Sequence, residues 1–397
     1  MQKTLNSLKA LLFASFLLFV GNSFLLSSNS IILKELGYNE LSIGLVNASI
    51  FLGALLSTFS AHIIIQKVGH IRAFGFFTSI FAIATLLHIY VNNIFLWALL
   101  RFSIGYSYYT LLVIIESWIN QSSKNTIRSR MLAIYEIVFY AGFSVGVLLL
   151  YFKLSFNNIF LIATFIILLC SLPLNLLKIE QPQIIKKEKI SIPNIFAVSK
   201  LAFFTAFIGG FLMNGFFSMS QTYFLALGYK VEDISLLIFI AMLGGFIAQI
   251  FIGRISDIYG RKLAILWCSL LGLFASVGLY FFSKYELVYV FCFLLGAGVF
   301  CLYALALARA SDRAKESSQI LNIGRTLMFA YVSSSIISAI CFGFLIEKYG
   351  ANAYMLTYII LLLGLTIFAH TQPKIDPEDR INYDEKPSQF VQLGENE

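Results

Sequence analysis

Charged side chains are scarce in this sequence of 397 residues. Asp, Glu, Lys and Arg make up 12% of it, whereas hydrophobic residues make up 59%. A soluble domain carries about a quarter charged residues, which keep its surface hydrated. The charges present here are too few to cover a surface in water, but apolar side chains face outward freely in lipid. The composition therefore excludes an ordinary soluble domain and predicts a membrane protein.

Motifs of catalysis and metal binding are also missing. The five cysteines lie in apolar stretches without CxxC spacing, which argues against a disulfide framework or a metal site. The four histidines are scattered and form no HExxH motif. The lack of a P-loop argues against ATP-driven transport by this chain. We expect no cofactor, no bound metal and no enzymatic activity.

Long apolar runs dominate the chain. About 20 apolar residues cross a bilayer as a helix. The first run lacks a small-residue cleavage site and is too long for a signal peptide, so we expect it to stay in the membrane. The sequence thus predicts an all-α membrane protein with twelve transmembrane helices. The expected spans are residues 10–33, 41–65, 73–91, 95–118, 131–152, 157–177, 201–227, 234–252, 263–282, 286–308, 319–345 and 351–370.

Lysine and arginine alternate between the loops. One set of loops, together with both ends of the chain, holds 21 of the 28 Lys and Arg residues, and the opposite loops hold five. Positive charge collects on the cytoplasmic side of inner-membrane proteins, so both termini are predicted to be cytoplasmic. The same distribution explains the net charge of +8 without a nucleic-acid partner. We expect a multi-pass protein of the inner (plasma) membrane.

The two halves of the sequence repeat each other. Segment 129–136 matches 318–325 at an offset of 189, and 19–22 matches 211–214 at an offset of 192. Matches in one order at a nearly constant offset indicate a duplicated six-helix unit. Three glycine pairs recur at an offset of 191: Gly53 and Gly244, Gly69 and Gly260, Gly105 and Gly296.

The repeat sets the expected domain boundaries. We predict one six-helix bundle at 1–178 and a second at 200–370. A cytoplasmic linker at 179–199 is rich in charge and contains proline. A polar tail at 371–397 is predicted to be disordered.

The loop after the eighth predicted span carries a family motif. It reads Gly253-Arg254-Ile255-Ser256-Asp257-Ile258-Tyr259-Gly260-Arg261-Lys262. This resembles the signature G-x-x-x-D-R-x-G-R-K of the major facilitator superfamily, with Ile258 in place of the first arginine. The segments Arg101-x-x-x-Gly105, Glu116-Ser117-x-x-Asn120 and Arg128-x-Arg130-x-Leu132-Ala133-x-Tyr135 resemble its YcaD-like subgroup. The resemblance covers about residues 10–370 and implies two pseudo-symmetric six-helix bundles around a central solute site.

The resemblance assigns this loop to gating, since the family loop is thought to latch the outward-facing state. Gly253 suits a close helix contact and Gly260 a tight turn. Asp257 suits a contact with the positive N-terminus of a neighbouring helix. The gating candidates are residues that shape the backbone or carry charge: Gly253, Asp257, Gly260, Arg261, Lys262 and Arg130.

Ionisable side chains inside the predicted spans are the strongest functional signal, because each costs roughly 2.5–3.5 kcal/mol on insertion scales. Glu136 and Arg325 occupy equivalent repeat positions with opposite charge, so we predict that they pair, directly or through a solute, when the cytoplasmic side is closed. The alternative is a separate partner for each within its own half. Glu116 and Glu136 are the proton-coupling candidates, although Glu116 could equally anchor an arginine of the next loop. Arg101 could meet an anionic solute group or a backbone carbonyl.

Polar residues inside two other spans complete the set of cavity candidates. Asn22 and Asn214 lie mid-span in the first and seventh runs, and Gln221 continues the second polar stripe. Hydrogen bonding between helices is the alternative for each amide. The solute-cavity candidates are therefore Asn22, Asn214, Arg101, Gln221, Glu136 and Arg325.

These features predict a secondary active transporter that moves a small solute by alternating access and is coupled to protons. A drug or metabolite efflux antiporter is the alternative to an uptake symporter. The spacing Gly142-x-x-x-Gly146, without the proline that follows in the antiporter motif, favours helix packing instead. A sensor or a membrane-embedded enzyme is less favoured, because the loops leave no room for a signalling domain and no catalytic cluster is present. We expect a monomer whose partners are lipid, the solute and protons.

Overall fold

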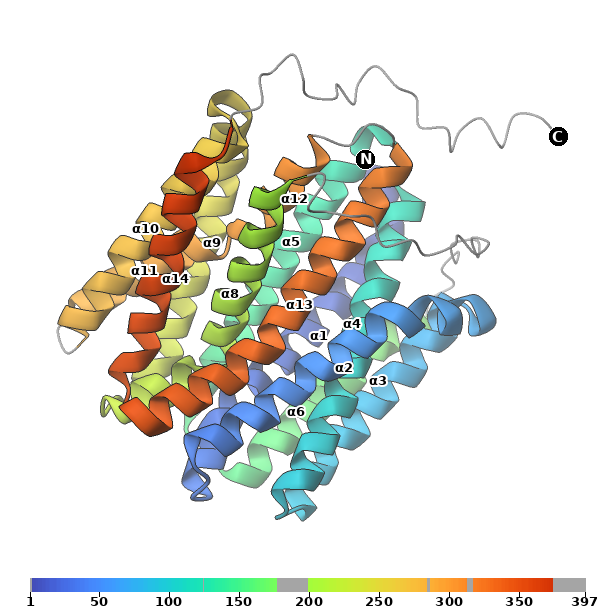
Figure 1. Cartoon of the computed structure of the whole chain (residues 1–397). Coiled ribbons are helices and arrows are strands. Elements are labelled where there is room, and N and C mark those ends of the chain that lie inside the picture. Colours follow the sequence, from blue (N-terminus) through green and yellow to red (C-terminus); the bar gives the residue numbers. More distant parts are fainter. Residues whose placement is uncertain (1, 124, 177–198, 284–285, 313–316, 374–397) are drawn as a thin grey trace.

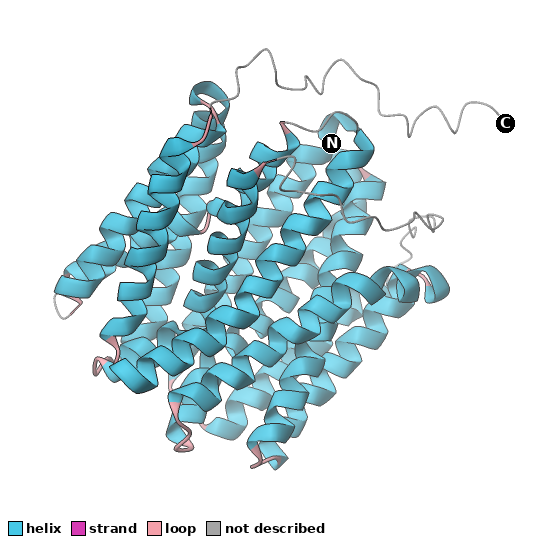
Figure 2. Cartoon of the chain, in the orientation of Figure 1, coloured by secondary structure: helices cyan, strands magenta, loops and turns pink. Residues whose placement is uncertain are grey.

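The computed structural model describes residues 2–123, 125–176, 199–283, 286–312 and 317–373. Within these ranges every regular element is helical and none is a strand (Figure 2). Twelve helical runs of the described chain are long and apolar enough to cross a membrane. The prediction of twelve spans is therefore confirmed. The predicted linker lies outside the described residues apart from Ser199, and the predicted tail lies outside them beyond Pro373.

The first half contains six spans. They are α1 (Gln2–Glu35), α2 (Glu40–Val68), α3 (His70–Leu87) with η1 (His88–Tyr90), α4 (Ile94–Ser122), α5 (Asn125–Leu148) with η2 (Leu149–Phe152), and α6 (Phe156–Leu176). The second half contains α8 (Lys200–Ala226), α9 (Val231–Tyr259), α10 (Arg261–Phe282), α11 (Leu287–Val299), α12 (Leu302–Ser311), α13 (Ser317–Tyr349) and α14 (Asn352–Thr371).

One predicted span is divided, since α11 and α12 share the tenth span. The residues between them, Phe300 and Cys301, keep right-handed helical angles, with φ of −72° and −85°. The chain therefore continues in one direction through the break. The sequence did not predict this interruption.

Some helix ends are marked by a capping side chain or by a glycine. The side chain of Asn39 accepts a hydrogen bond from Ser42 N at 3.0 Å, and Asn93 caps α4 in the same way through Phe95 N at 2.8 Å. Gly69 ends α2 at φ 81° and Gly260 ends α9 at φ 94°, a region of backbone space that favours glycine. The tight turn predicted at Gly260 is present.

The glycine repeat corresponds to one packing contact made twice. A Cβ on Gly53 or Gly105 would collide with the facing backbone, so α2 and α4 cross at van der Waals distance there. Gly244 and Gly296 bring α9 and α11 together in the same way. Since the two crossings are 191 residues apart, as are the turns at Gly69 and Gly260, the halves are structural copies of each other.

The halves meet mainly where α2 contacts α13, α5 contacts α9 and α1 contacts α8; α2 also contacts α8, and η2 contacts α9. Both α1 and α14 have their chain-terminal ends at one end of the bundle, which we call the terminal face (Figure 1). The opposite end, where α1 ends and α2 begins, is called the far face.

We expect Gly105→Ala and Gly296→Ala each to lower the free energy of unfolding by about 1–3 kcal/mol, because the added methyl group forces two helices apart. Thermal unfolding in detergent measures this loss. Gly364→Ala is the matched control, since a Cβ there meets nothing within 4 Å. Equal melting temperatures for the crossing variants and the control would contradict the close contact.

Candidate functional site

The far face is closed by contacts between the halves. Glu347, near the end of α13, accepts hydrogen bonds from Leu41 N at 2.9 Å and from Asn39 Nδ2 at 3.2 Å. A carboxylate placed there also meets the positive end of the α2 dipole. On the other side of the molecule, Lys153 forms an ion pair with Glu232 in the first turn of α9. The two contacts fasten opposite sides of the same face.

A buried polar network lies beneath these contacts. Ser30 Oγ and Asn47 Nδ2, from the first half, both donate to Ser218 O at 2.7 Å. Asn29 Nδ2 in turn donates to Asn47 Oδ1 at 2.8 Å. These residues are fully buried, so water is excluded from this layer. The layer joins α1, α2 and α8 across the boundary between the halves.

Gln221 belongs to this closed region. Its side chain is completely buried, and its Nε2 donates to Phe217 O of its own helix at 3.1 Å. We predicted that Gln221 lines the solute cavity; in this conformation it is enclosed instead. Its depth along α8 places it among the residues that seal the far face.

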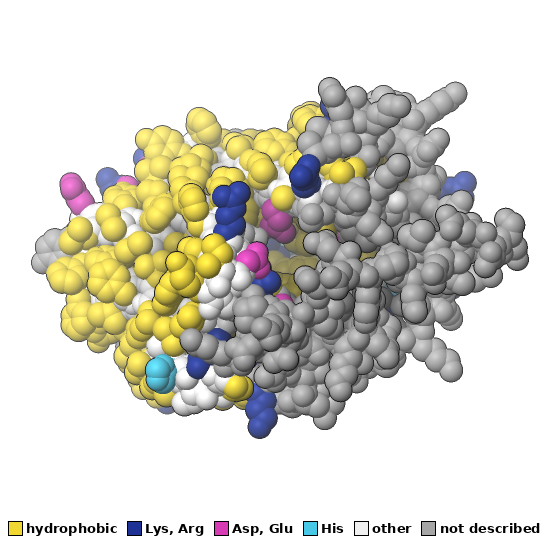
Figure 3. Space-filling model, turned by 90° about the horizontal axis from the view of Figure 1, so that it is seen from above, with side chains coloured by type: hydrophobic (Ala, Val, Ile, Leu, Met, Phe, Trp, Pro, Cys, Tyr) yellow, Lys and Arg dark blue, Asp and Glu magenta, His cyan; other side chains and the backbone are white. Residues whose placement is uncertain are grey.

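The terminal face is open by contrast. Seen from that side, the molecule is hollowed near its centre, and acidic and basic side chains gather around the visible part of the hollow (Figure 3). Glu116 on α4 and Glu136 on α5 are both solvent-exposed although they lie within membrane spans. The two carboxylates lie within electrostatic reach of each other. We call this region the central site.

Tyrosines from both halves surround the two carboxylates. Tyr135 donates a hydrogen bond to Glu116, and Tyr140 donates to Gln249 Oε1 across the halves at 2.8 Å. From the second half, Tyr303 is within electrostatic reach of Glu116 and Tyr331 is within reach of Glu136. The site is therefore built between the bundles.

Asn22 and Asn214 lie at the edge of this cluster, in equivalent positions. The Asn22 amide donates to Tyr108, and the Asn214 amide donates to Tyr331 and, at 2.7 Å, to Ser335 Oγ. Each side chain is 8% exposed. The structure thus shows the interhelical bonding that was the alternative role, and it also places both amides beside the central tyrosines.

Arg101 does not face the hollow. It is fully buried within the first half and donates to Leu25 O at 3.2 Å. Of the two roles left open by the sequence, the backbone-carbonyl contact is the one present. The ring of His88 lies within electrostatic reach, packed among Trp97 and Phe160.

The predicted pair of Glu136 with Arg325 is not formed in this conformation; the ion pairs of the described chain do not include it. The ring of Phe329 meets that of Phe59 of α2 edge to face, and residues four apart share a helix face. Arg325 therefore points toward α2, whereas Tyr331 of the same helix points to the central site. The pair remains a prediction for a state in which the terminal face is closed.

The motif loop binds its own half together. Arg261 forms an ion pair with Asp257, and its Nε lies 3.3 Å from Asp312 Oδ2 at the end of α12. Lys262 Nζ donates to His370 O at 2.8 Å. A Cβ on Gly253 would meet nothing within 4 Å, so the close helix contact expected there is absent in this conformation. Arg130 is exposed at the start of its span.

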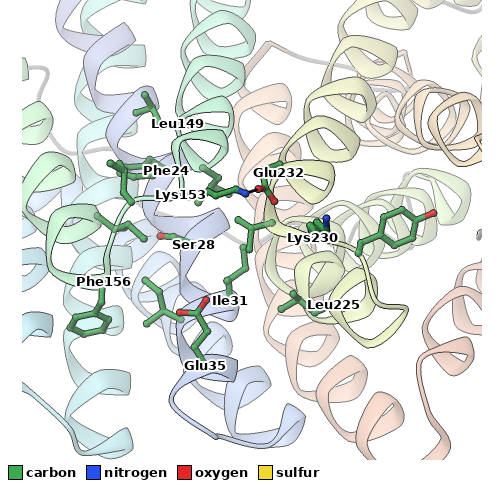
Figure 4. Close-up of a pocket in the computed structure, with 16 residues that line it drawn as sticks. Phe24, Ser28, Ile31, Glu35, Leu149, Lys153, Phe156, Leu225, Lys230 and Glu232 are labelled. Carbon is green, nitrogen blue, oxygen red and sulfur yellow. Dashed lines mark ion pairs between the residues drawn. The ribbon is translucent and has the colours of Figure 1, made fainter.

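A side cavity of about 490 Å³ opens near the far face, between α1, η2 and α6 of the first half and the α8–α9 turn of the second (Figure 4). Phe24, Ile31 and Leu225 line it with apolar surface, and the Lys153–Glu232 ion pair lies across it. None of the predicted site residues lines this cavity. It is distinct from the central site.

The sequence did not predict two sets of candidate functional residues. The far-face contacts of Glu347, Lys153 and Glu232 join segments distant in sequence, and no local pattern marks them. The sequence contains a weak indication of the central tyrosines, because a phenol hydroxyl inside a membrane span needs a hydrogen-bond partner. The packing role favoured for Gly142 and Gly146 is confirmed, since a Cβ on either would strike α1.

Known proteins resemble this chain in sequence. Residues 11–326 match the profile of the Major Facilitator Superfamily. An uncharacterised transporter of this type, YcaD of Escherichia fergusonii, is 25% identical over 341 residues, which cover 83% of this chain and 87% of that protein. A relative from Yersinia enterocolitica is 25% identical over 340 residues and covers 81% and 86%.

Solved structures resemble it in fold. A point mutant of the nucleoside transporter NupG superposes with a TM-score of 0.79 at 15% identity, covering 92% of this chain and 99% of that one. A D-xylose–proton symporter superposes with a TM-score of 0.71 at 12% identity, covering 91% and 97%. From the family match over most of its length and from its fold, this chain belongs to the major facilitator superfamily, as a membrane transporter and not an enzyme.

Proposed function

We propose that this protein is a secondary active transporter that moves a small solute across the inner membrane by alternating access. One observation carries the proposal: a central site built by both halves is closed toward the far face and open toward the terminal face. The positive-inside distribution of Lys and Arg supports cytoplasmic termini. With that orientation, the conformation faces inward. The moving units are the predicted bundles, 1–178 and 200–370, in a monomer.

Proton coupling is part of the proposal. Glu116 and Glu136 are carboxyl groups that face the hollow from adjacent helices, within reach of each other. Among the side chains that the structure describes, which do not include Arg128, no Lys, Arg or His nitrogen lies within 4.0 Å of either group. Carboxyl groups without a basic partner are free to exchange protons with water in the hollow. The similarity in fold to a D-xylose–proton symporter supports the same idea.

Alternating access is tested by two distances that change in opposite directions. In a background without the five native cysteines, spin labels at Leu36 and Tyr349 report the far face, and labels at Val68 and Ile258 report the terminal face. All four positions are exposed. Double electron–electron resonance measures both distance distributions. Changes in both distances in the same direction would contradict the mechanism.

We expect Glu347→Gln to open the far face and close the terminal face. Removing the negative charge weakens the contact with the α2 N-terminus by about 1 kcal/mol, which shifts the ratio of the two states roughly fivefold. The far-face distance should lengthen and the terminal-face distance should shorten. Glu286→Gln is the matched control, because it removes the same charge on the same face, and the Glu286 side chain forms no ion pair with a described residue of the first half. An identical response of both variants would contradict the latch role of Glu347.

The pairing of Glu136 with Arg325 predicts a charge-swap result. Glu136→Arg and Arg325→Glu should each deplete the state in which the terminal face is closed, because each places like charges together. The double variant should restore that state, as measured with the Val68–Ile258 label pair. An unchanged distribution in the variant that combines Glu136→Gln with Arg325→Gln would show that the two residues do not pair.

A further inference from the structure

The charge of the central site limits the chemical classes of solute that could bind there. Glu116 and Glu136 both face the hollow, and Tyr108, Tyr135 and Tyr303 lie within reach of Glu116. Among the described side chains, a set without Arg128, no basic nitrogen lies within 4.0 Å of either carboxylate. A solute with a carboxylate or phosphate would meet like charge here, whereas a cation would find two anions.

Phenol rings from both halves lie near the two carboxylates. Tyr303 and Tyr331 lie side by side in the second half, with ring centroids 4.7 Å apart. Tyr108 and Tyr109 lie in the first half with centroids 5.4 Å apart, and Tyr109 is within electrostatic reach of Tyr331. Aromatic faces attract cations through the ring quadrupole, and they also stack on other flat rings.

Two of these phenol hydroxyls donate only to weak acceptors within the protein. The hydroxyls of Tyr303 and Tyr331 donate to the sulfurs of Met328, at 3.7 Å, and Met213, at 3.2 Å. A thioether is a weak acceptor, so the Tyr303 hydroxyl remains available to a solute, whereas the Tyr331 hydroxyl also accepts a hydrogen bond from the Asn214 amide. The amides of Asn22 and Asn214, by contrast, already bond to protein groups. A site for a polyhydroxylated solute would need such amides free.

We propose that the solute of the central site is an organic cation that carries a flat aromatic ring. Its ring lies between the Tyr108–Tyr109 pair and the Tyr303–Tyr331 pair, and its positive charge lies against Glu116 and Glu136. This inference rests on the proposed transport function and specifies the substrate class of the same site. It also provides a direct route to exchange, because a cation and a proton would compete for the same two carboxylates.

Binding of methylphenylpyridinium to the purified full chain tests the proposal. The probe carries a flat, permanently charged pyridinium ring linked to a phenyl ring. We expect saturable binding in a radioligand assay, and competition by protons as the pH is lowered. Glu116→Gln and Glu136→Gln should each weaken binding about tenfold or more. Tyr303→Leu should weaken it several-fold, and Tyr303→Phe should retain it. Glu286→Gln should bind as the unaltered protein does.

Three related probes separate charge from ring. Phenylpyridine is uncharged at mildly alkaline pH and keeps the rings, tetraethylammonium keeps the charge without a ring, and biphenyl carboxylate reverses the charge. We expect all three to bind at least tenfold more weakly than methylphenylpyridinium. Equal binding of the charged and uncharged ring compounds, or unchanged affinity in both glutamine variants, would overturn the proposal.

The label distances distinguish the two kinds of failure. If the far-face and terminal-face distances alternate but methylphenylpyridinium does not bind, the substrate class is wrong and the transport function stands. If the distances do not alternate in any variant or with any probe, the transport function itself fails. Variants that lose binding are checked for thermal unfolding, so that a misfolded protein is not mistaken for one with an altered site.

Discussion

The absence of water from the bilayer core is the constraint on which this structure depends. A backbone N–H or C=O that finds no partner there costs several kcal/mol, so each span must bond its own backbone as a helix. Loops such as Leu36–Asn39 and Val91–Asn93 are confined to the ends of the bundle for the same reason. The hydrophobic effect does not drive helices together inside a lipid bilayer, so close packing holds them instead. Close packing explains the glycines where α2 crosses α4 and where α9 crosses α11.

The same constraint governs the charges. Arg101 lies in the dry interior and meets a backbone carbonyl, while Glu116 and Glu136 lie where the hollow admits solvent. A carboxylate inside a span is tolerable if it is hydrated or hydrogen-bonded, and Glu116 has both kinds of support, since Tyr135 donates to it. Placing acidic groups in the hollow thus couples their stability to the state of the protein. Closing the terminal face would remove that solvent, and each carboxylate would then need a proton, a cation or, for Glu136, the predicted partner Arg325.

The sequence predicted the fold well because the length of each apolar run shows where a helix enters and leaves the membrane. Twelve spans, the duplicated unit and the turn at Gly260 all follow from run lengths and glycine spacing. The site was predicted only in part. Asn22, Asn214, Glu116 and Glu136 do gather at the centre, but Gln221, Arg101 and Arg325 do not face it in this state. A helix that is apolar on every side has no polar stripe to fix its rotation, so its sequence gives the depth of a residue without its direction. The central tyrosines were missed for a related reason, because an aromatic residue in a span is equally suited to lipid and to a solute.

The contact of Gly44 with α13 has a geometric consequence for transport. A Cβ on Gly44 would collide with the backbone of Ala339 and Gly343, so α2 and α13 touch near the far face with no side chain between them. From Gly44 to the end of α2 at Val68 the helix extends about 36 Å at the usual rise per residue. That length is a lever arm. A rotation of about 15° around the contact, of the size seen when protein subunits pivot, displaces the distant tip by roughly 9 Å. Small angular changes near the far face are thus converted into an aperture wide enough for a solute at the terminal face.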